Sequence, residues 1–101
     1  MAAIEGMIWR VFGSKNHIKV LMFLHKLSRV RSDTTMKELE RRTGVSRATL
    51  VRIIKDMSKA KIVMIRGATK GQIVTILNTP QRKIIWNFIK DFEKSFYTYR
   101  K

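Results

Sequence analysis

The stretch that decides the fold is TMKELERRTGVSRATLVRIIKDMSKAKIVMIRGATKGQIVTIL, residues 35–77. It predicts two short helices on either side of a turn at residues 43–46 (TGVS), followed by a two-stranded β-hairpin with a basic tip. A protein that places one helix in a groove of DNA and supports it with a flanking loop needs its elements in this order. The stretch therefore predicts a DNA-binding module, and it says nothing of the target sequence.

Both helices of this stretch have recognisable start signals. Thr34 or Thr35 can cap the first helix, and Thr35 with Glu38 fits a capping box; the helix ends near residue 42. Gly44 supplies the backbone freedom that the tight turn needs, and Val45 fills the corner. Ser46 offers a cap to the second helix, which runs to about residue 59. The expected inward stripe of this second helix is Leu50, Ile53, Ile54 and Met57.

The flanking segments predict further elements. Apolar residues at helical spacing form an N-terminal arm that Gly13 ends, and Ser14 can cap a helix that runs to about residue 28. Residues 29–34 are polar and predict a loop. Two β-branched runs, 62–65 and 72–77, predict the hairpin strands, and Thr79 followed by Pro80 starts a last helix towards Tyr99. The apolar face expected for the helix after Ser14 is Ile18, Leu21, Met22, Leu24 and Leu27.

A chain of 101 residues has room for one modest core, so a single domain is predicted. Its parts are the arm (1–13), a central core (14–79) and a C-terminal helix (80–101). The predicted fold class is mainly α with a small β-hairpin, which makes it an α+β fold.

The charge of the chain indicates an anionic partner. There are 22 Lys and Arg against 7 Asp and Glu, a formal net charge of +15. A surface adapted for solubility or for high temperature normally balances Lys with Glu, whereas acids are scarce here. Between residues 43 and 83 there are nine basic residues and one acid, Asp56. Double-stranded DNA, bound largely through its phosphates, is therefore the expected partner.

One face of the second helix carries the residues expected to touch DNA. Opposite the inward stripe lie Ala48, Arg52, Lys55 and Lys59. Arg47 and Arg52 could each donate two hydrogen bonds to O6 and N7 of a guanine, and Ala48 or Thr49 could touch a thymine methyl group. We expect base contacts from Arg47, Ala48, Thr49 and Arg52, and phosphate contacts from Thr35, Ser46, Lys55 and Lys59. The competing interpretation is a solvated basic face on an ordinary helix.

The segment VSRATLVRIIKDMSKAKIV, followed by the hairpin, resembles the winged helix-turn-helix of MarR-like and related prokaryotic transcription regulators. The resemblance covers residues 14–77 and implies a winged helix-turn-helix with additional N- and C-terminal helices. It also implies a recognition helix at 46–59 and a wing at 62–77, in which Arg66 or Lys70 reaches a minor groove or its phosphates. A second resemblance is to small winged-helix proteins of archaea and their viruses.

The chain departs from the pattern of that family at two places. The family usually ends the recognition helix with a glycine, where this chain has Lys61. Because a lysine resists the left-handed backbone conformation, we expect a different turn into the wing. The tip of the wing is short, and Lys70 is its outermost basic residue, which argues against deep reading of the minor groove.

The last helix predicts a partner chain. Ile85, Ile89, Phe92, Phe96 and Tyr99 recur at spacings of four, three, four and three, which is typical of a heptad seam. Part of this helix must pack on the protein's own core, and Ile84, Trp86 and Phe88 are the residues expected to do so. We expect a homodimer. The predicted dimer interface is Ile4, Ile8, Val11, Ile85, Ile89, Phe92, Phe96 and Tyr99.

Other classes of function find little support in the sequence. There is no cysteine, and His17 and His25, which we expect to be partly exposed, have few acids near them in the sequence, so no metal and no cofactor is expected. No residues have the spacing of a catalytic group, no small-molecule effector is evident, and no run is apolar enough for a membrane. We therefore expect a cytoplasmic protein that is not an enzyme.

The sequence favours a homodimeric transcription regulator that binds double-stranded DNA sequence-specifically. Two alternatives use the same fold. One is a sequence-independent architectural or chromatin-type DNA binder, and the other is a winged-helix module for protein interaction, against which the net charge of +15 argues.

Overall fold

The computed structural model describes residues 2–67 and 71–99, and in these the predicted class is confirmed: mainly α, with a small antiparallel sheet. The side chains of residues 4–67 and 71–96 are described. The elements in chain order are α1 (Ala2–Phe12), α2 (Lys15–Leu27), β1 (Asp33–Thr35), α3 (Met36–Thr43), α4 (Arg47–Lys59), β2 (Val63–Arg66), β3 (Ile73–Ile76) and α5 (Pro80–Tyr99). Among the described helices, none combines the length and the apolar composition needed to span a bilayer.

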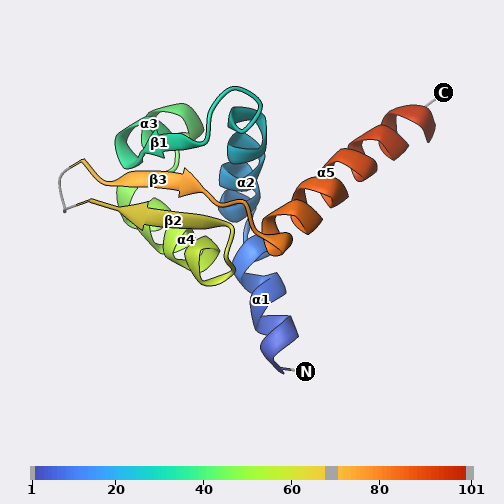
Figure 1. Ribbon diagram of the computed structural model, residues 1–101, viewed down its shortest axis with the longest axis horizontal. Coiled ribbons are helices and arrows are strands. Elements are labelled where there is room, and N and C mark those ends of the chain that lie inside the picture. Colours follow the sequence, from blue (N-terminus) through green and yellow to red (C-terminus); the bar gives the residue numbers. More distant parts are fainter. Residues whose placement is uncertain (1, 68–70, 100–101) are drawn as a thin grey trace.

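The sheet has one strand more than the predicted hairpin. Its order is β1-β3-β2, and both pairings are antiparallel. The loop expected at 29–34 therefore ends early, because Thr34 pairs with Val74 and is 3% exposed. Three polar residues show no alternation that would predict a strand, and only the long-range pairing with β3 forms it. As a result the wing is attached to the residues that start α3 (Figure 1).

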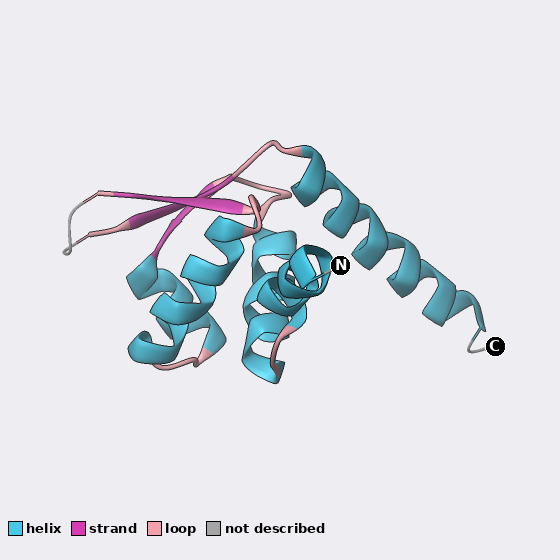
Figure 2. Ribbon diagram, turned by 90° about the horizontal axis from the view of Figure 1, so that it is seen from below, coloured by secondary structure: helices cyan, strands magenta, loops and turns pink. Residues whose placement is uncertain are grey.

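The core lies where α2, α3, α4 and one face of the sheet meet, and Val11 of α1 and Trp86 and Ile89 of α5 complete it. All four residues of the predicted stripe on α4 are at most 1% exposed. In Figure 2 the strands lie along one side of these helices. The face of α2 differs from the prediction, because Val20 and His25 are buried, whereas Ile18 and Met22 are 45% and 37% exposed. Both exposed residues line a groove that is shared with α5.

The helix α5 projects away from the rest of the protein, as both ribbon views show (Figures 1 and 2). Thr79 caps it by accepting a hydrogen bond from the Arg82 backbone N–H (3.2 Å), and Arg82 Nε donates to the Leu77 carbonyl (2.8 Å). Trp86 Nε1 donates to Ser28 Oγ at the end of α2 (2.8 Å). These contacts hold only the first part of α5 against the core.

This attachment corrects the predicted division of α5. Trp86 packs on the core as expected, whereas Ile84 is 66% exposed. Phe88 is 53% exposed, but its ring packs edge-on against Phe12, with 6.0 Å between the ring centres. Ile85 packs against the core and Ile89 is buried in it, although both were assigned to a dimer interface. The prediction for Val11 on α1 fails in the same way, since it is 4% exposed. The reason is that α5 packs on the core through one face of its first half, the face that carries Ile85, Trp86 and Ile89.

His25 is buried, contrary to the expectation of partial exposure. The His25 ring packs edge-on against Trp86, with 5.4 Å between the ring centres, and His25 as a whole is 7% exposed. His25 follows Leu21 by four residues, so both lie on the same face of α2. Burial lowers the pKa of His25 below its usual value, the positive charge of Arg29 lowers it further, and Glu93 opposes the shift.

We predict that acid loosens the attachment of α5 through His25. The folded protein prefers the neutral ring, so it binds fewer protons there than the unfolded chain does. Stability should therefore fall as the pH drops below about 6.5, the usual value for histidine. Thermal unfolding of the wild type and His25→Gln between pH 8 and pH 5 checks this. The variant should have a lower melting temperature than the wild type at pH 8, but its melting temperature should fall less between pH 8 and pH 5. An equal fall in the two proteins would exclude His25 as the cause.

Candidate nucleic-acid interface

The turn between α3 and α4 has the predicted geometry. Gly44 has a left-handed backbone with φ of 76°, and its N–H donates to the Glu40 carbonyl (3.0 Å). Val45 is buried at the corner, and its N–H donates to Thr43 Oγ1 (3.2 Å). The turn thus sets α4 at an angle to α3 and leaves the start of α4 on the surface.

Thr35 caps α3 as predicted, since its Oγ1 accepts a hydrogen bond from the Glu38 N–H (3.0 Å). The Glu38 carboxylate accepts hydrogen bonds from Thr34 Oγ1 and Arg31 Nη2 (2.5 Å each), and so it ties β1 and the preceding loop to α3. The Thr34 hydrogen bond, the Arg31 hydrogen bond and the positive charges of Arg31 and Arg42 lower the pKa of Glu38, although desolvation opposes them. Glu38 therefore holds the cap in place as an ionised group.

Ser46 occupies the cap position of α4 with an extended backbone, but its side chain makes no capping hydrogen bond to α4. Its hydroxyl donates to Thr49 Oγ1 instead (3.1 Å). The Ser46 side chain therefore does not occupy the first N–H groups of α4. Uncapped N–H groups at the start of a helix suit a phosphate.

The exposed face of α4 is the one that the sequence predicted. Ala48, Arg52, Lys55 and Lys59 are exposed, and Thr49 is half-buried at the edge. Among the described residues, Arg52, Lys55 and Lys59 take part in no ion pair, whereas Arg47 Nε donates to Glu40 Oε1 on α3 (3.2 Å). The face therefore presents cations that the protein does not itself neutralise.

Polar contacts hold α3 and α4 against α2. His17 Nε2 lies 3.0 Å from Asp56 Oδ2, and its Nδ1 lies 2.7 Å from Ser14 Oγ. Asp56 is the one acid on α4, so this contact also turns its carboxylate towards α2. The Arg42 guanidinium lies over the Phe23 ring, 5.3 Å from its centre, and joins α3 to α2. Sequence spacing could not show these contacts, because residues 17 and 56 are 39 positions apart.

Lys61 adopts the left-handed conformation that we expected it to avoid, with φ of 66°. The Ile62 N–H donates to the Met57 carbonyl and the Lys61 N–H to the Ser58 carbonyl (3.0 Å each), which is the hydrogen-bond pattern of a Schellman motif. Ile62 is fully buried, and Thr79 Oγ1 donates to the Lys61 carbonyl (2.6 Å). These contacts outweigh the strain, so the usual turn into the wing is kept without a glycine.

The wing carries fewer free cations than expected. Arg66 is exposed, but its Nη2 lies 3.8 Å from Asp33 Oδ1 on β1. Asp33 also accepts a hydrogen bond from Thr75 Oγ1 (2.8 Å), so this carboxylate is held on the wing. Lys70, the other predicted wing contact, lies outside the described residues. Within those residues no three potential ligands gather that could hold a metal ion.

Residues 14–78 match the model of the MarR family. The chain belongs to this family. Its members are winged-helix transcription regulators that bind DNA and are not enzymes. The match covers the module from the start of α2 to the end of the wing, which agrees with the resemblance found in the sequence. A search of curated proteins found no match.

Solved structures show the same winged-helix fold. A crystal structure from Archaeoglobus fulgidus has a TM-score of 0.64 and 19% identity, covering 77% of this chain and 84% of that chain. A homodimeric winged helix-turn-helix DNA-binding domain from Mycobacterium bovis, a possible ArsR-family regulator, has a TM-score of 0.67 and 13% identity over 97% of this chain and 88% of that one. An ArsR family transcriptional regulator has a TM-score of 0.60 and 12% identity over 93% and 90%.

We predict that Lys61→Gly stabilises the protein by about 0.5–1 kcal/mol, because relief of the left-handed strain exceeds the added freedom of the unfolded chain. Denaturation by urea measures the change. The matched control is Lys59→Gly, two residues earlier at the end of α4. Its free energy of unfolding should fall by about 1 kcal/mol or less, because glycine weakens a helix. A loss of stability in Lys61→Gly would contradict the prediction.

Proposed function

We propose that this protein is a homodimeric transcription regulator that recognises a specific sequence of double-stranded DNA. In this proposal α4 lies in the major groove, and the wing lies on the flanking backbone or minor groove. Arg47, Ala48, Thr49 and Arg52 contact bases. Phosphates are contacted by Thr35, Ser46, Lys55 and Lys59, and by Arg66 and Lys70 on the wing.

The observation that carries the proposal is the unneutralised basic face of α4. The buried stripe of this helix faces the core, so Arg52 and Lys55 face solvent, and Ser46 makes no capping hydrogen bond at the start of the helix. In a helix-turn-helix the N-terminal residues of the second helix reach base edges, whereas residues further along meet the phosphates. Membership of the MarR family supports the same assignment.

The homodimer rests on exposed apolar side chains of α1 and α5. Ile4 and Ile8 are 65% and 56% exposed, and Phe92 and Phe96 are 65% and 53% exposed. Of the other predicted interface residues, Val11 and Ile89 are buried in the core and Ile85 is partly buried against it, so these four remain at the surface. Phe88, beside them on α5, is 53% exposed. The side chain of Tyr99 lies outside the described residues.

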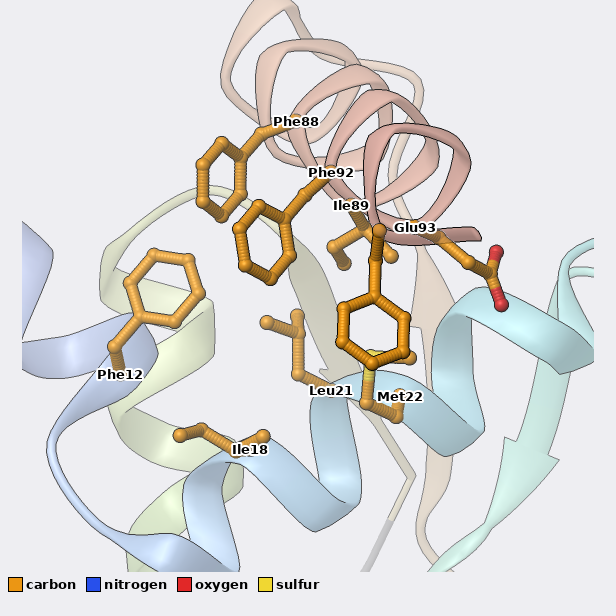
Figure 3. Close-up of a pocket in the computed structure, with 9 residues that line it drawn as sticks. Phe12, Ile18, Leu21, Met22, Phe88, Ile89, Phe92 and Glu93 are labelled. Atoms are coloured by element: carbon orange, nitrogen blue, oxygen red, sulfur yellow. The ribbon is translucent and has the colours of Figure 1, made fainter. Parts of the chain in front are cut away.

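An apolar groove runs beneath α5. It has a volume of about 540 Å³ and lies between α1, α2 and α5. Figure 3 shows Phe12, Ile18 and Met22 facing Phe88 and Phe92 across it. So much exposed apolar surface is unusual for a monomer, and a second copy would bury it. The neighbour from Mycobacterium bovis is itself a homodimer. Pairing of this kind would separate two α4 helices by about 34 Å, one turn of DNA.

In vitro selection of bound DNA from a random pool tests sequence specificity and pairing together. The proposal requires enrichment of a near-palindromic site with half-site centres about 10 base pairs apart. An enriched site without symmetry would contradict the dimer, and the absence of any enriched site would contradict specific recognition.

A second candidate function, sequence-independent DNA binding, is favoured by the net charge of +15. Both functions predict affinity that falls as salt rises, because bound phosphates release counterions. Competition by random DNA over a range of salt concentrations separates them, since a purely electrostatic binder has the same affinity for the selected site as for random DNA.

We predict that Arg52→Ala loses about 1–3 kcal/mol of binding free energy at one base position and relaxes specificity there. Binding assays on the selected site and its single-base variants measure this. Lys90→Ala removes the same charge from exposed α5 and is the matched control, with no expected change in base preference. Equal weakening on all sequences would instead assign Arg52 to a phosphate.

We predict that Phe92→Glu yields a monomer that still folds, because Phe92 is 65% exposed and its loss opens no cavity. Light scattering measures the mass, and binding to the full site should weaken towards that of a half-site. Asn87→Glu introduces the same charge on an exposed part of α5 away from the aromatic stripe and should remain a dimer. A Phe92→Glu dimer would place the interface elsewhere.

A further inference from the structure

The ion pair between Glu40 and Arg47 crosses the turn that defines the helix-turn-helix. Arg47 is the first residue of α4, and Glu40 lies in the second half of α3. Arg47 Nε donates to Glu40 Oε1 at 3.2 Å, and the two side chains are 47% and 42% exposed. The Gly44 N–H donates to the Glu40 carbonyl, so the backbone of Glu40 is itself held by the turn. The contact therefore links one of the expected base-reading residues to a fixed point on α3.

Such a pair contributes little to the stability of the protein, because both side chains are about half exposed to water. Its geometry has a different consequence. The guanidinium group is planar and has five N–H donors in a rigid arrangement. Because the carboxylate holds Nε, the side chain is restrained, whereas the two Nη groups make no hydrogen bond in the described part of the protein. Those two groups form the edge that can donate to O6 and N7 of a guanine.

We propose that Glu40 is a positioning residue for Arg47 and that it prepares the free edge of the guanidinium to read a guanine. This inference rests on the proposed function, in which the start of α4 faces base edges in the major groove. Glu40 itself touches no base. It lowers the loss of side-chain freedom when Arg47 binds, and so it increases affinity for the correct sequence above that for other sequences.

The opposite effect would follow if Glu40 acted by charge alone. A carboxylate near DNA repels phosphates, so its removal would strengthen binding to every sequence to the same extent. Positioning predicts that removal weakens binding to the selected site relative to random DNA. The ratio of the two affinities therefore separates the two roles, which a measurement on one DNA cannot do.

The experiment measures affinities for the selected site and for a random duplex of equal length, using the wild type, Glu40→Ala, Glu40→Gln, Arg47→Ala and the double variant with alanine at both positions. Glu40→Ala should lower the affinity ratio roughly three- to tenfold, less than the loss of a full bidentate contact. Glu40→Gln should retain most of the ratio, because its amide oxygen still accepts from Nε. The double variant should be no less selective than Arg47→Ala.

Asp91→Ala is the matched control. Asp91 is exposed on α5, so this variant makes the same change in net charge far from the turn and should leave the ratio unchanged. Thermal unfolding of Glu40→Ala should match that of the wild type, which separates positioning from a loss of folded protein.

Two results would overturn the inference, and they differ in what else they contradict. If Arg47→Ala loses selectivity at a guanine and Glu40→Ala does not, Glu40 has no positioning role while the proposed function stands. If the wild type prefers no sequence, the proposed specific recognition fails and the role of Glu40 fails with it.

Discussion

The burial of one stripe of α4 is the constraint on which the rest of the structure depends. Leu50, Ile53, Ile54 and Met57 are at most 1% exposed, and their removal from water fixes the rotation of the helix about its own axis. A helix so fixed can present only one face to solvent, and that face carries Arg52, Lys55 and Lys59. The burial of the apolar stripe thus determines which basic side chains of α4 face solvent and are available to DNA, although the core residues themselves touch no DNA.

Four of the acidic residues join different parts of the binding module to one another. Asp33, Glu38, Glu40 and Asp56 each contact a basic side chain in a different element or loop. These contacts join the wing to β1, the cap of α3 to the preceding loop, α3 to α4, and α2 to α4. They arrange the binding module, and the remaining excess of positive charge is left for a polyanion.

The projecting helix α5 has a first part that packs on the core and a second part whose aromatic side chains are exposed. Its first turns are held by Trp86, Ser28 and His25, so its direction is set by the core. Beyond them the aromatic residues Phe88, Phe92 and Phe96 stay exposed above the groove between α1, α2 and α5. The exposed apolar surface and the basic face of α4 therefore lie on different elements of the molecule.

Local patterns in the sequence determined the elements that depend on near neighbours. The cap at Thr35, the turn at Gly44, the buried stripe of α4 and the start of α5 at Pro80 all follow from residues within a few positions of one another. The outward face of α4 followed from the same periodicity, and so the candidate base and phosphate contacts could be named before any fold was known.

Only the tertiary structure decided what depends on residues far apart in the chain. The strand β1 exists because Thr34 meets Val74, and Lys61 keeps its strained backbone because Ile62 is buried and Thr79 holds its carbonyl. The division of α5 between core and surface, the burial of His25, and the contact of Asp56 with His17 depend on how helices cross. Periodicity says which residues share a face, but the partner that covers that face is set by packing between distant segments, which leaves no local pattern to detect.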